Sequence, residues 1–309
     1  MYLDYVEDLE KDLMERHEGK TLDDLFHGET CETSQGSSYR IEDSIKFKFK
    51  CINKYKAKTT IIRDLKLING IGDAKECKLK SEGYETIEDL LEHPSYSSKA
   101  SELLNKLDES PLTCISECYS ASNPNRLFSS SYRAVDDFVF FDIETLGLKD
   151  RPVILIGMAR IEEGNMKITQ YLATRLDDEK HMLSSFISNT NSQTVFVSFN
   201  GRSFDLPFIR SRARIYRIPR NLNQPHLDLL HFSRRTWRDH LPNCRLQTIE
   251  QHLFNMERHE DVPSSHVPAF YNTYLNTGNI GPLVPIVEHN KQDVITLARI
   301  MSRLQDEIV

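Results

Sequence analysis

Apolar positions along the chain change their spacing near Asp137. Beyond it, short apolar stretches typical of strands alternate with stretches typical of helices. The predicted strands are Phe138–Asp142, Val153–Ile161, Lys167–Ala173, Thr194–Phe199 and one near His226–Leu230. The predicted helices are Asp178–Ser188, Phe204–Tyr216, Leu246–Phe254, a stretch around Pro268–Asn276, and a closing helix from about Leu283 to Glu307. This order predicts an α/β layer architecture.

The first part of the chain follows a different pattern. Residues 1–60 begin with an acidic helical pattern, pass through a Gly/Ser/Thr-rich stretch, and then alternate Lys with Phe from Lys46 to Lys50, which predicts a short strand. Residues 61–109 have the pattern of a compact helical unit. The stretch 110–134 is rich in Ser and Asn and is the predicted linker. We therefore predict an acidic N-terminal segment, a small helical domain, a linker and an α/β domain over 135–309.

Charge is distributed unevenly. The 309 residues carry 46 acidic and 39 basic side chains, a net charge of -7, and residues 1–44 alone hold 13 acids against 4 bases. The remainder is nearly neutral, so the net charge does not exclude a nucleic-acid partner. Two basic runs could face phosphate or could be ordinary solvated surface: Lys46, Lys48, Lys50, Lys54, Lys56 and Lys58; and Arg202, Arg210, Arg212, Arg214, Arg217 and Arg220.

Membrane insertion and disulfide scaffolding are not expected. No apolar run approaches the roughly 18 residues that cross a bilayer, and the acidic N-terminus does not resemble a secretory signal. The six cysteines contain no Cys-x-x-Cys pair, in agreement with a reducing compartment. We expect a cytoplasmic protein.

Two acids end the first strand of the α/β region. Asp142 and Glu144 are two residues apart, so their side chains point to the same side of the strand. Like charges placed side by side raise one another's pKa unless a cation lies between them, and a divalent metal would supply that cation. The alternative is a solvated strand-to-turn junction.

Two further segments carry candidate chemistry. Asp205 follows an Asn-Gly break after the strand 194–199 and would lie at a ligand-binding strand edge, or would merely cap a helix N-terminus. His289 and Asp293 are four residues apart in the closing helix and share one face, as an ordinary surface pair also would. Together with Asp142 and Glu144, these side chains are what a two-metal phosphodiester hydrolase requires. A histidine with a pKa near 6.5 suits a general base.

Three motifs in order resemble a known superfamily. Phe141-Asp-Ile-Glu-Thr145, Phe199-Asn-Gly-Arg-Ser-Phe-Asp-Leu-Pro-Phe208 and His289-Asn-Lys-Gln-Asp293 are similar to the exonuclease motifs of the DEDD (DnaQ-like) superfamily, in particular its YprB-like branch. The resemblance covers about residues 135 to 305. It implies a ribonuclease H-like mixed sheet flanked by helices, which is also the fold that the order of predicted strands indicates.

The resemblance implies a 3′→5′ exonuclease that uses two divalent ions, Mg²⁺ or Mn²⁺. Asp142, Glu144 and Asp293 would bind the first ion, Asp142 would bridge to the second, and Asp205 would hold the second through water. His289 would orient or deprotonate the attacking water. It lies four residues before the last Asp, the spacing of the superfamily's tyrosine class, whereas its histidine class uses five.

Candidate nucleic-acid contacts lie in both domains. Leu65–Leu91 resembles a helix-hairpin-helix motif, whose predicted core is Leu67, Ile68, Ile71, Ala74 and Leu79. A Gly-x-Gly turn exposes backbone N–H groups to phosphate, so Gly70, Gly72, Lys75 and Lys78 are predicted DNA contacts. The same fold can serve as a protein-docking module. In the α/β domain, the predicted contacts are Thr145, Asn200, Arg202, Ser203, Phe204 and Arg210.

Substrate and partners follow from these features. A helix-hairpin-helix contact with duplex DNA favours a DNA exonuclease in repair over an RNA exonuclease in RNA processing. A non-catalytic binding protein is a weaker alternative, because no ligand acid is missing. The YprB-like branch is associated with DNA helicases, so the resemblance implies a possible helicase partner.

Asp228 is either a fifth ligand or, as we favour, a structural acid. The acidic N-terminal segment is either a partner-docking arm or folds onto the nuclease domain.

Overall fold

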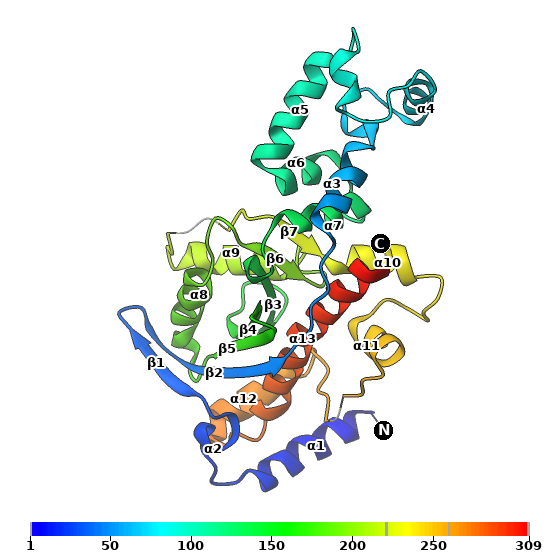
Figure 1. Cartoon of the computed structure of the whole chain (residues 1–309). Coiled ribbons are helices and arrows are strands. Elements are labelled where there is room, and N and C mark those ends of the chain that lie inside the picture. The colour runs from blue at the N-terminus through cyan, green and yellow to red at the C-terminus, as the bar shows by residue number, and fades with distance from the viewer. Residues whose placement is uncertain (1, 220–221, 259, 308–309) are drawn as a thin grey trace. The chain divides into compact units, whose positions relative to one another are not determined.

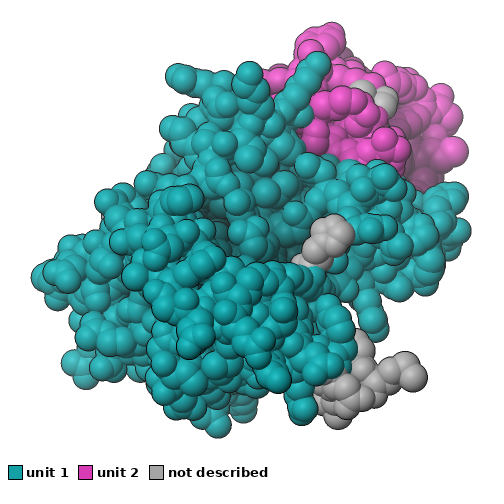
Figure 2. Space-filling model, turned by 90° about the horizontal axis from the view of Figure 1, so that it is seen from below, with its two compact units in different colours: residues 1–49, 135–301 teal, residues 50–134, 302–309 magenta. Residues whose placement is uncertain are grey.

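The computed structural model describes residues 2–219, 222–258 and 260–307. The chain forms two compact units, each built from non-contiguous segments (Figure 2). Unit 1 comprises residues 1–49 and 135–301, and unit 2 comprises residues 50–134 with the segment from 302 onward. Arg220, the last member of the predicted arginine run, lies outside the described residues.

Unit 1 is built on a mixed sheet. Within the described residues, its seven strands follow the order β1-β2-β5-β4-β3-β6-β7 (Figure 1). The strands are β1 (Glu29–Thr33), β2 (Gly36–Lys46), β3 (Phe138–Thr145), β4 (Val153–Glu162), β5 (Asn165–Leu172), β6 (Val195–Ser198) and β7 (His226–Asp228). In this order, each neighbouring pair from β1 through β2, β5 and β4 to β3 is antiparallel. The last two pairs, β3 with β6 and β6 with β7, are parallel. This confirms the ribonuclease H-like sheet flanked by helices that the sequence predicts.

Helices cover both faces of this sheet. The helices of unit 1 are α1 (Tyr2–Arg16), α2 (Leu22–Phe26), α8 (Glu179–Ser188), α9 (Asp205–Ile215), α10 (Leu229–Trp237), α11 (Leu246–Phe254), α12 (Val267–Thr277) and most of α13 (Leu283–Glu307). Successive residues of β3 point to opposite faces. Phe141 contacts Phe186 of α8, with ring centroids 5.6 Å apart. The Asn290 side chain of α13 hydrogen-bonds Asp142 on the opposite face.

The acidic N-terminal segment folds onto the α/β domain. In α1, Val6, Leu9 and Leu13 are buried within the main core of unit 1. The strand β2 pairs with β5 along its length, from Tyr39 opposite Leu172 onward. This is the second of the two alternatives for the acidic segment. The predicted boundary at residue 60 is corrected, because residues 1–49 belong to unit 1 and residues 50–60 belong to unit 2.

Two predicted strands differ in extent. Between Lys46 and Lys50, the lysines are exposed and Phe47 and Phe49 are half-buried, as the alternation predicts. These residues nevertheless do not form a strand of their own, because β2 ends at Lys46. The predicted strand His226–Leu230 ends at Asp228, whose carboxylate accepts the Leu230 N–H and begins α10. Side-chain capping, which alternation does not show, decides that boundary.

Unit 2 is helical. Its elements are α3 (Lys54–Ile62), α4 (Asp73–Ser81), α5 (Ser97–Glu109), α6 (Pro111–Cys118) and α7 (Pro124–Ser129), with 3₁₀ turns at Leu65–Leu67, Asp89–Glu92 and Ser130–Tyr132. The linker predicted over 110–134 is corrected to α6 and α7. Each starts with a proline at its first position, which suits a helix N-terminus, and Ile115 and Phe128 join the core of unit 2.

No helix in the part of the chain that the structure describes has the length and apolar character required to span a bilayer. The six cysteines are free thiols.

Candidate active site

A cleft of about 510 Å³ brings the predicted acids together. Asp142, Glu144, Asp205 and Asp293 all line it, as does His289. The other lining residues are Ile143, Thr145, Gly147, Leu148, Phe199, Asn200, Phe204, Ser264, Ser265 and Pro268. Segments more than 140 residues apart in the sequence therefore meet in one site.

Three elements position the acids. Asp142 and Glu144 lie two residues apart near the end of β3, where the pairing with β4 shifts between Glu144 and Thr145. Asp205 is the first residue of α9, and its Oδ1 accepts the Ile143 N–H at 3.3 Å. Asp293 comes from α13, where His289 lies one turn earlier.

The acids on β3 and α9 lie in surroundings unfavourable to negative charge. Burial and the neighbouring charges of Asp293 and Asp205 raise the pKa of Asp142 well above its usual range. Burial raises the pKa of Glu144 to about 7 and that of Asp205 to about 7. Crowded buried carboxylates with few hydrogen-bond donors are what a bound cation would stabilise.

Asp293 is the exception. Burial alone would raise its pKa, but the hydrogen bond and charge of His289 and the charge of Arg258 outweigh burial and lower it. Its carboxylate accepts a hydrogen bond from the Arg258 guanidinium, and His289 Nε2 lies 3.5 Å from Asp293 Oδ2. The predicted pairing of His289 with Asp293 on one helix face is thereby confirmed.

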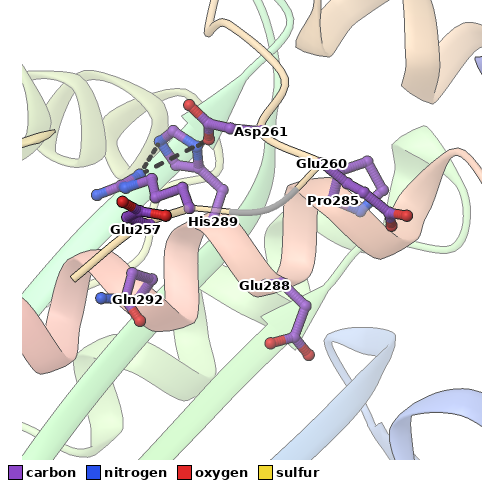
Figure 3. Close-up of a pocket in the computed structure, with 8 residues that line it drawn as sticks. Glu257, Glu260, Asp261, Pro285, Glu288, His289 and Gln292 are labelled. Atoms are coloured by element: carbon purple, nitrogen blue, oxygen red, sulfur yellow. Dashed lines mark hydrogen bonds and ion pairs between the residues drawn. The ribbon is translucent and has the colours of Figure 1, made fainter. Parts of the chain in front are cut away.

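His289 is held from both sides. Its Nδ1 lies 2.7 Å from Asp261 Oδ1, in the loop before α12, and Figure 3 shows these two side chains pointing toward each other. Burial alone would lower the pKa of His289, but the hydrogen bonds to Asp261 and Asp293 raise it to about 11. The two carboxylates therefore favour the protonated imidazole.

Arg258 ties this side of the cleft to α11. Its guanidinium donates to Glu250 Oε2 at 2.6 Å and Oε1 at 2.8 Å, and its Nη1 lies 3.1 Å from His289 Nε2. The same turn of α13 borders a smaller pocket of about 280 Å³, whose lining includes Glu257, Glu260, Glu288 and Gln292 (Figure 3).

The donor set fits divalent ions of the Mg²⁺ type. Carboxylate oxygens are the ligands that Mg²⁺ and Mn²⁺ prefer. Among the described residues, no three His, Cys, Asp or Glu side chains converge closely enough to hold an ion by themselves. An ion held at these carboxylates would therefore also need waters or substrate phosphate as ligands, as Mg²⁺ sites usually have.

Asp228 differs from the cleft acids. Its carboxylate accepts three backbone N–H groups, from Asn200 at 2.8 Å, Arg202 at 3.2 Å and Leu230 at 3.2 Å. It therefore joins the turn after β6 to the start of α10, which is the structural role that we favoured.

The predicted nucleic-acid contacts of the α/β domain separate into two groups. Thr145, Asn200 and Phe204 line the cleft. Arg202 and Ser203 are exposed and do not line the cleft. Arg210 donates to the Leu222 backbone oxygen from Nε at 3.2 Å, so its guanidinium already holds the chain segment after α9.

The hairpin loop of unit 2 has the predicted glycine geometry at one position. Gly70 has a φ of 96°, which favours glycine, and Gly72 precedes α4 with no side-chain cap. Lys75 Nζ donates to the Gly70 carbonyl oxygen at 2.8 Å, and Lys78 extends into solvent. Ala74, predicted as core, is exposed.

The remaining predicted hairpin core is buried, namely Leu67, Ile68, Ile71 and Leu79. Ala74 is exposed because it lies in the first turn of α4, on the side of that helix that faces solvent.

Sequence reasoning assigned no site role to Arg258, Asp261, Glu250 or Asn290. The first three lie between the second and third motifs, where nothing in their spacing marks a shared site. Asn290 was visible as the neighbour of His289. Since it points toward β3 rather than into the cleft, only the packing of α13 on the sheet reveals its contact with Asp142.

Comparison with known proteins agrees with this geometry. The RNase_H_2 family, described as the RNase_H superfamily, matches residues 139–305, which is more than half of the chain. The uncharacterized protein YprB of Bacillus subtilis is 29% identical over 179 residues. That match covers 56% of this chain and 43% of YprB, so the chain spans less than half the length of this relative.

Proposed function

The chain belongs to the RNase H superfamily, which indicates a nuclease, and from this premise we propose a metal-dependent 3′→5′ exonuclease that hydrolyses DNA. The observation that carries the proposal is the convergence of Asp142, Glu144, Asp205 and Asp293 in one cleft. The raised pKa values of three of these acids support a cationic ligand.

The assignment of ligands follows the motif resemblance. Asp142, Glu144 and Asp293 would hold a first divalent ion, Asp142 would also reach a second, and Asp205 would hold the second through water. When bound, such ions polarise the scissile phosphate and the attacking water. The protein fixes the positions of the four carboxylates from β3, α9 and α13.

His289 would orient or deprotonate the attacking water. A general base must be neutral, whereas the hydrogen bonds to Asp261 and Asp293 raise the pKa of this imidazole to about 11. The charges of Asp293 and Glu144 contribute to that protonation. Their neutralisation by cations would lower the pKa of His289 toward the range in which it can accept a proton.

The walls of the cleft suit a terminal nucleotide. Phe199, Phe204 and Pro268 provide apolar surface beside the acids, and Asn200 and Ser264 provide polar groups. A nucleobase and sugar require apolar contact, while the phosphodiester would lie at the carboxylates. The direction of attack, from a 3′ end, rests on the motif resemblance.

The preference for DNA and a role in repair rest on unit 2. The N-terminus of α4, with Gly70 and Gly72 before it, is proposed as a sequence-independent phosphate contact, and the exposed Lys78 in the last turn of the same helix would add positive charge. A helicase partner is proposed from the motif resemblance alone.

The deciding experiment is a denaturing-gel time course with 5′-labelled single-stranded DNA, duplex DNA and matched RNA, in Mg²⁺, Mn²⁺ or EDTA. We expect a metal-dependent ladder that shortens from the 3′ end on DNA. Faster shortening of RNA would assign the protein to RNA processing. Binding in a gel shift without cleavage of any substrate would reject the exonuclease.

A further inference from the structure

A row of three residues crosses the sheet beneath α13. The strand register places Asp142 of β3 opposite Gly157 of β4, and Gly157 opposite Gln170 of β5. Residues directly opposite one another in antiparallel strands present their side chains on the same face. The central residue has no side chain, so a gap separates the catalytic acid from the glutamine.

Asn290 of α13 fills this gap. Its side chain is fully buried, with 0% exposure. A Cβ atom at Gly157 would overlap the Asn290 amide, approaching its Cγ to 2.8 Å. Glycine is therefore required at this position for the helix side chain to reach the strands.

Hydrogen bonds orient the Asn290 amide. Gln170 Nε2 donates to Asn290 Oδ1 at 2.9 Å and also to the Val287 carbonyl oxygen at 2.9 Å. Asn290 Nδ2 donates to Asp142 Oδ2 at 3.0 Å and to the Asp142 carbonyl oxygen at 3.2 Å. Turning the amide over would place its oxygen against a carboxylate and its N–H groups against those of Gln170, so a single orientation satisfies both neighbours.

We infer that Asn290, oriented by Gln170, is a positioning residue that fixes the Asp142 carboxylate for the divalent ions. The inference rests on the proposed function, in which Asp142 contacts both ions. A hydrogen bond to Oδ2 restricts rotation of the carboxylate, and partners of this kind commonly change metal affinity or activity by about 10- to 100-fold. Gly157 is part of the same device because it leaves the space that the amide occupies.

The test measures metal binding directly. Isothermal titration of the full chain with Mn²⁺ should show about tenfold or greater weakening in Asn290→Ala. The matched control is Asn279→Ala, because the Asn279 amide is also satisfied at both atoms, by Gly281 N–H and the Met14 carbonyl oxygen, and does not touch the acids. This control should bind Mn²⁺ as the parent protein does, with circular dichroism confirming that both variants are folded.

Kinetics separates positioning from packing. In Asn290→Ala, kcat at low Mn²⁺ should fall about 10- to 100-fold and recover as Mn²⁺ is raised, with KM for the nucleic acid unchanged. Gln170→Leu should give the same pattern at reduced size, about threefold to tenfold. It also carries the test if Asn290→Ala fails to fold.

The possible outcomes discriminate. Unchanged Mn²⁺ affinity and unchanged kcat in a folded Asn290→Ala or Gln170→Leu variant would overturn the inference while leaving the exonuclease proposal intact. The opposite result is also informative. If the parent protein cleaves no nucleic acid but both variants bind Mn²⁺ more weakly than the parent does, the proposed function is rejected and the positioning role of Asn290 is supported.

Discussion

Two groups of buried acids in unit 1 differ in how their charge is satisfied. Glu179, at the start of α8, accepts the Val153 N–H at 2.9 Å, Arg212 Nε at 2.7 Å and the Tyr216 hydroxyl at 2.8 Å. Asp205 in the cleft is also buried, but among the contacts of the described residues its carboxylate accepts only one hydrogen bond from another residue, a longer one from the Ile143 N–H at 3.3 Å. A buried carboxylate with a full set of donors stabilises the fold, whereas one with few donors is available to a ligand.

The largest expected effect is on catalysis at the cleft. Asp205→Asn should reduce hydrolysis to the detection limit, about 10⁴-fold or more, because an amide is a poor ligand for a divalent ion. It should leave the free energy of unfolding unchanged or raised, since it removes a crowded charge. Single-turnover cleavage and urea denaturation measure the two effects. Full activity in this variant would remove Asp205 from the metal site.

Glu179→Gln tests the other half of the comparison. Removal of one partner from the buried pair with Arg212 should lower the free energy of unfolding by about 3 kcal/mol. The rate constant per folded molecule should stay as it is, because Glu179 does not line the cleft. A loss of catalysis without a loss of stability would show that donor satisfaction does not separate structural from functional acids.

His289→Ala should slow hydrolysis by about 10²- to 10⁴-fold, as expected of a group that prepares the water. The loss should appear in kcat rather than in Mn²⁺ affinity, because His289 is not an expected ligand. A change below threefold would assign preparation of the water to another group. Asp261→Asn serves as the comparison variant: the His289 Nδ1–H keeps an oxygen acceptor, so a smaller loss is expected.

The pH dependence of stability should follow the donor-poor acids. The pKa values of Glu144 and Asp205 are raised in the folded state to about 7, so the stability that their protonation contributes is present below about pH 4 and is lost as pH rises through 7. His289, with its pKa raised to about 11, adds a further loss between about pH 6.5 and 11. Asp293 has the opposite sign, but its lowered pKa places that change below this window.

In EDTA, the free energy of unfolding should therefore fall by several kcal/mol from pH 5 to pH 8, because Glu144 and Asp205 both titrate within that range in the folded state. Mg²⁺ should stabilise the protein more at pH 8 than at pH 5. The control is Glu144→Gln combined with Asp205→Asn, in which the decrease should shrink. Urea titrations at both pH values measure it, and an equal decrease in the double variant would assign the pH dependence to other groups.

The sequence predicted the parts of unit 1 that depend on local pattern. β3, β4, α8, α9, α11 and α13 match the predicted ranges within a few residues, because the helices have a regular apolar period and the two central strands are apolar runs buried on both faces. The four acids were found because strand spacing pairs Asp142 with Glu144, Asp205 begins a helix, and helix spacing pairs Asp293 with His289. The roles of Arg258 and Asn290 were not predictable, since they depend on how α11 and α13 pack against the sheet.

The errors have the same origin. The stretch 110–134 is polar in composition, yet Ile115 and Phe128 supply enough apolar surface for α6 and α7 to join a core already formed by other helices. The segment 1–60 was delimited by its local pattern, whereas β5, the strand that pairs with β2, lies more than a hundred residues later in the chain. Composition reports the surface of an element and not the neighbour that covers its other face.

The criterion of charge satisfaction also distinguishes two lysines in unit 2, and there the smallest effect is expected. Lys78 is 76% exposed and lies 3.7 Å from Glu82, whereas Lys106 pairs with Glu102 at 2.7 Å. Lys78→Ala should weaken binding of duplex DNA about twofold to fivefold and reduce the salt slope by about one, as loss of one phosphate contact does. Lys106→Ala should change neither.

Because Lys78 does not line the cleft, its substitution should leave cleavage of a short single-stranded substrate unchanged. Fluorescence anisotropy with duplex DNA at several salt concentrations measures the contrast. Equal behaviour of Lys78→Ala and Lys106→Ala would indicate that the hairpin does not contact DNA, and would favour the protein-docking alternative for unit 2. A weakly paired lysine would then mark a partner surface rather than a phosphate site. The number of hydrogen-bond partners would in that case separate structural from functional groups among buried carboxylates but not among exposed lysines, because water itself satisfies the charge of an exposed lysine.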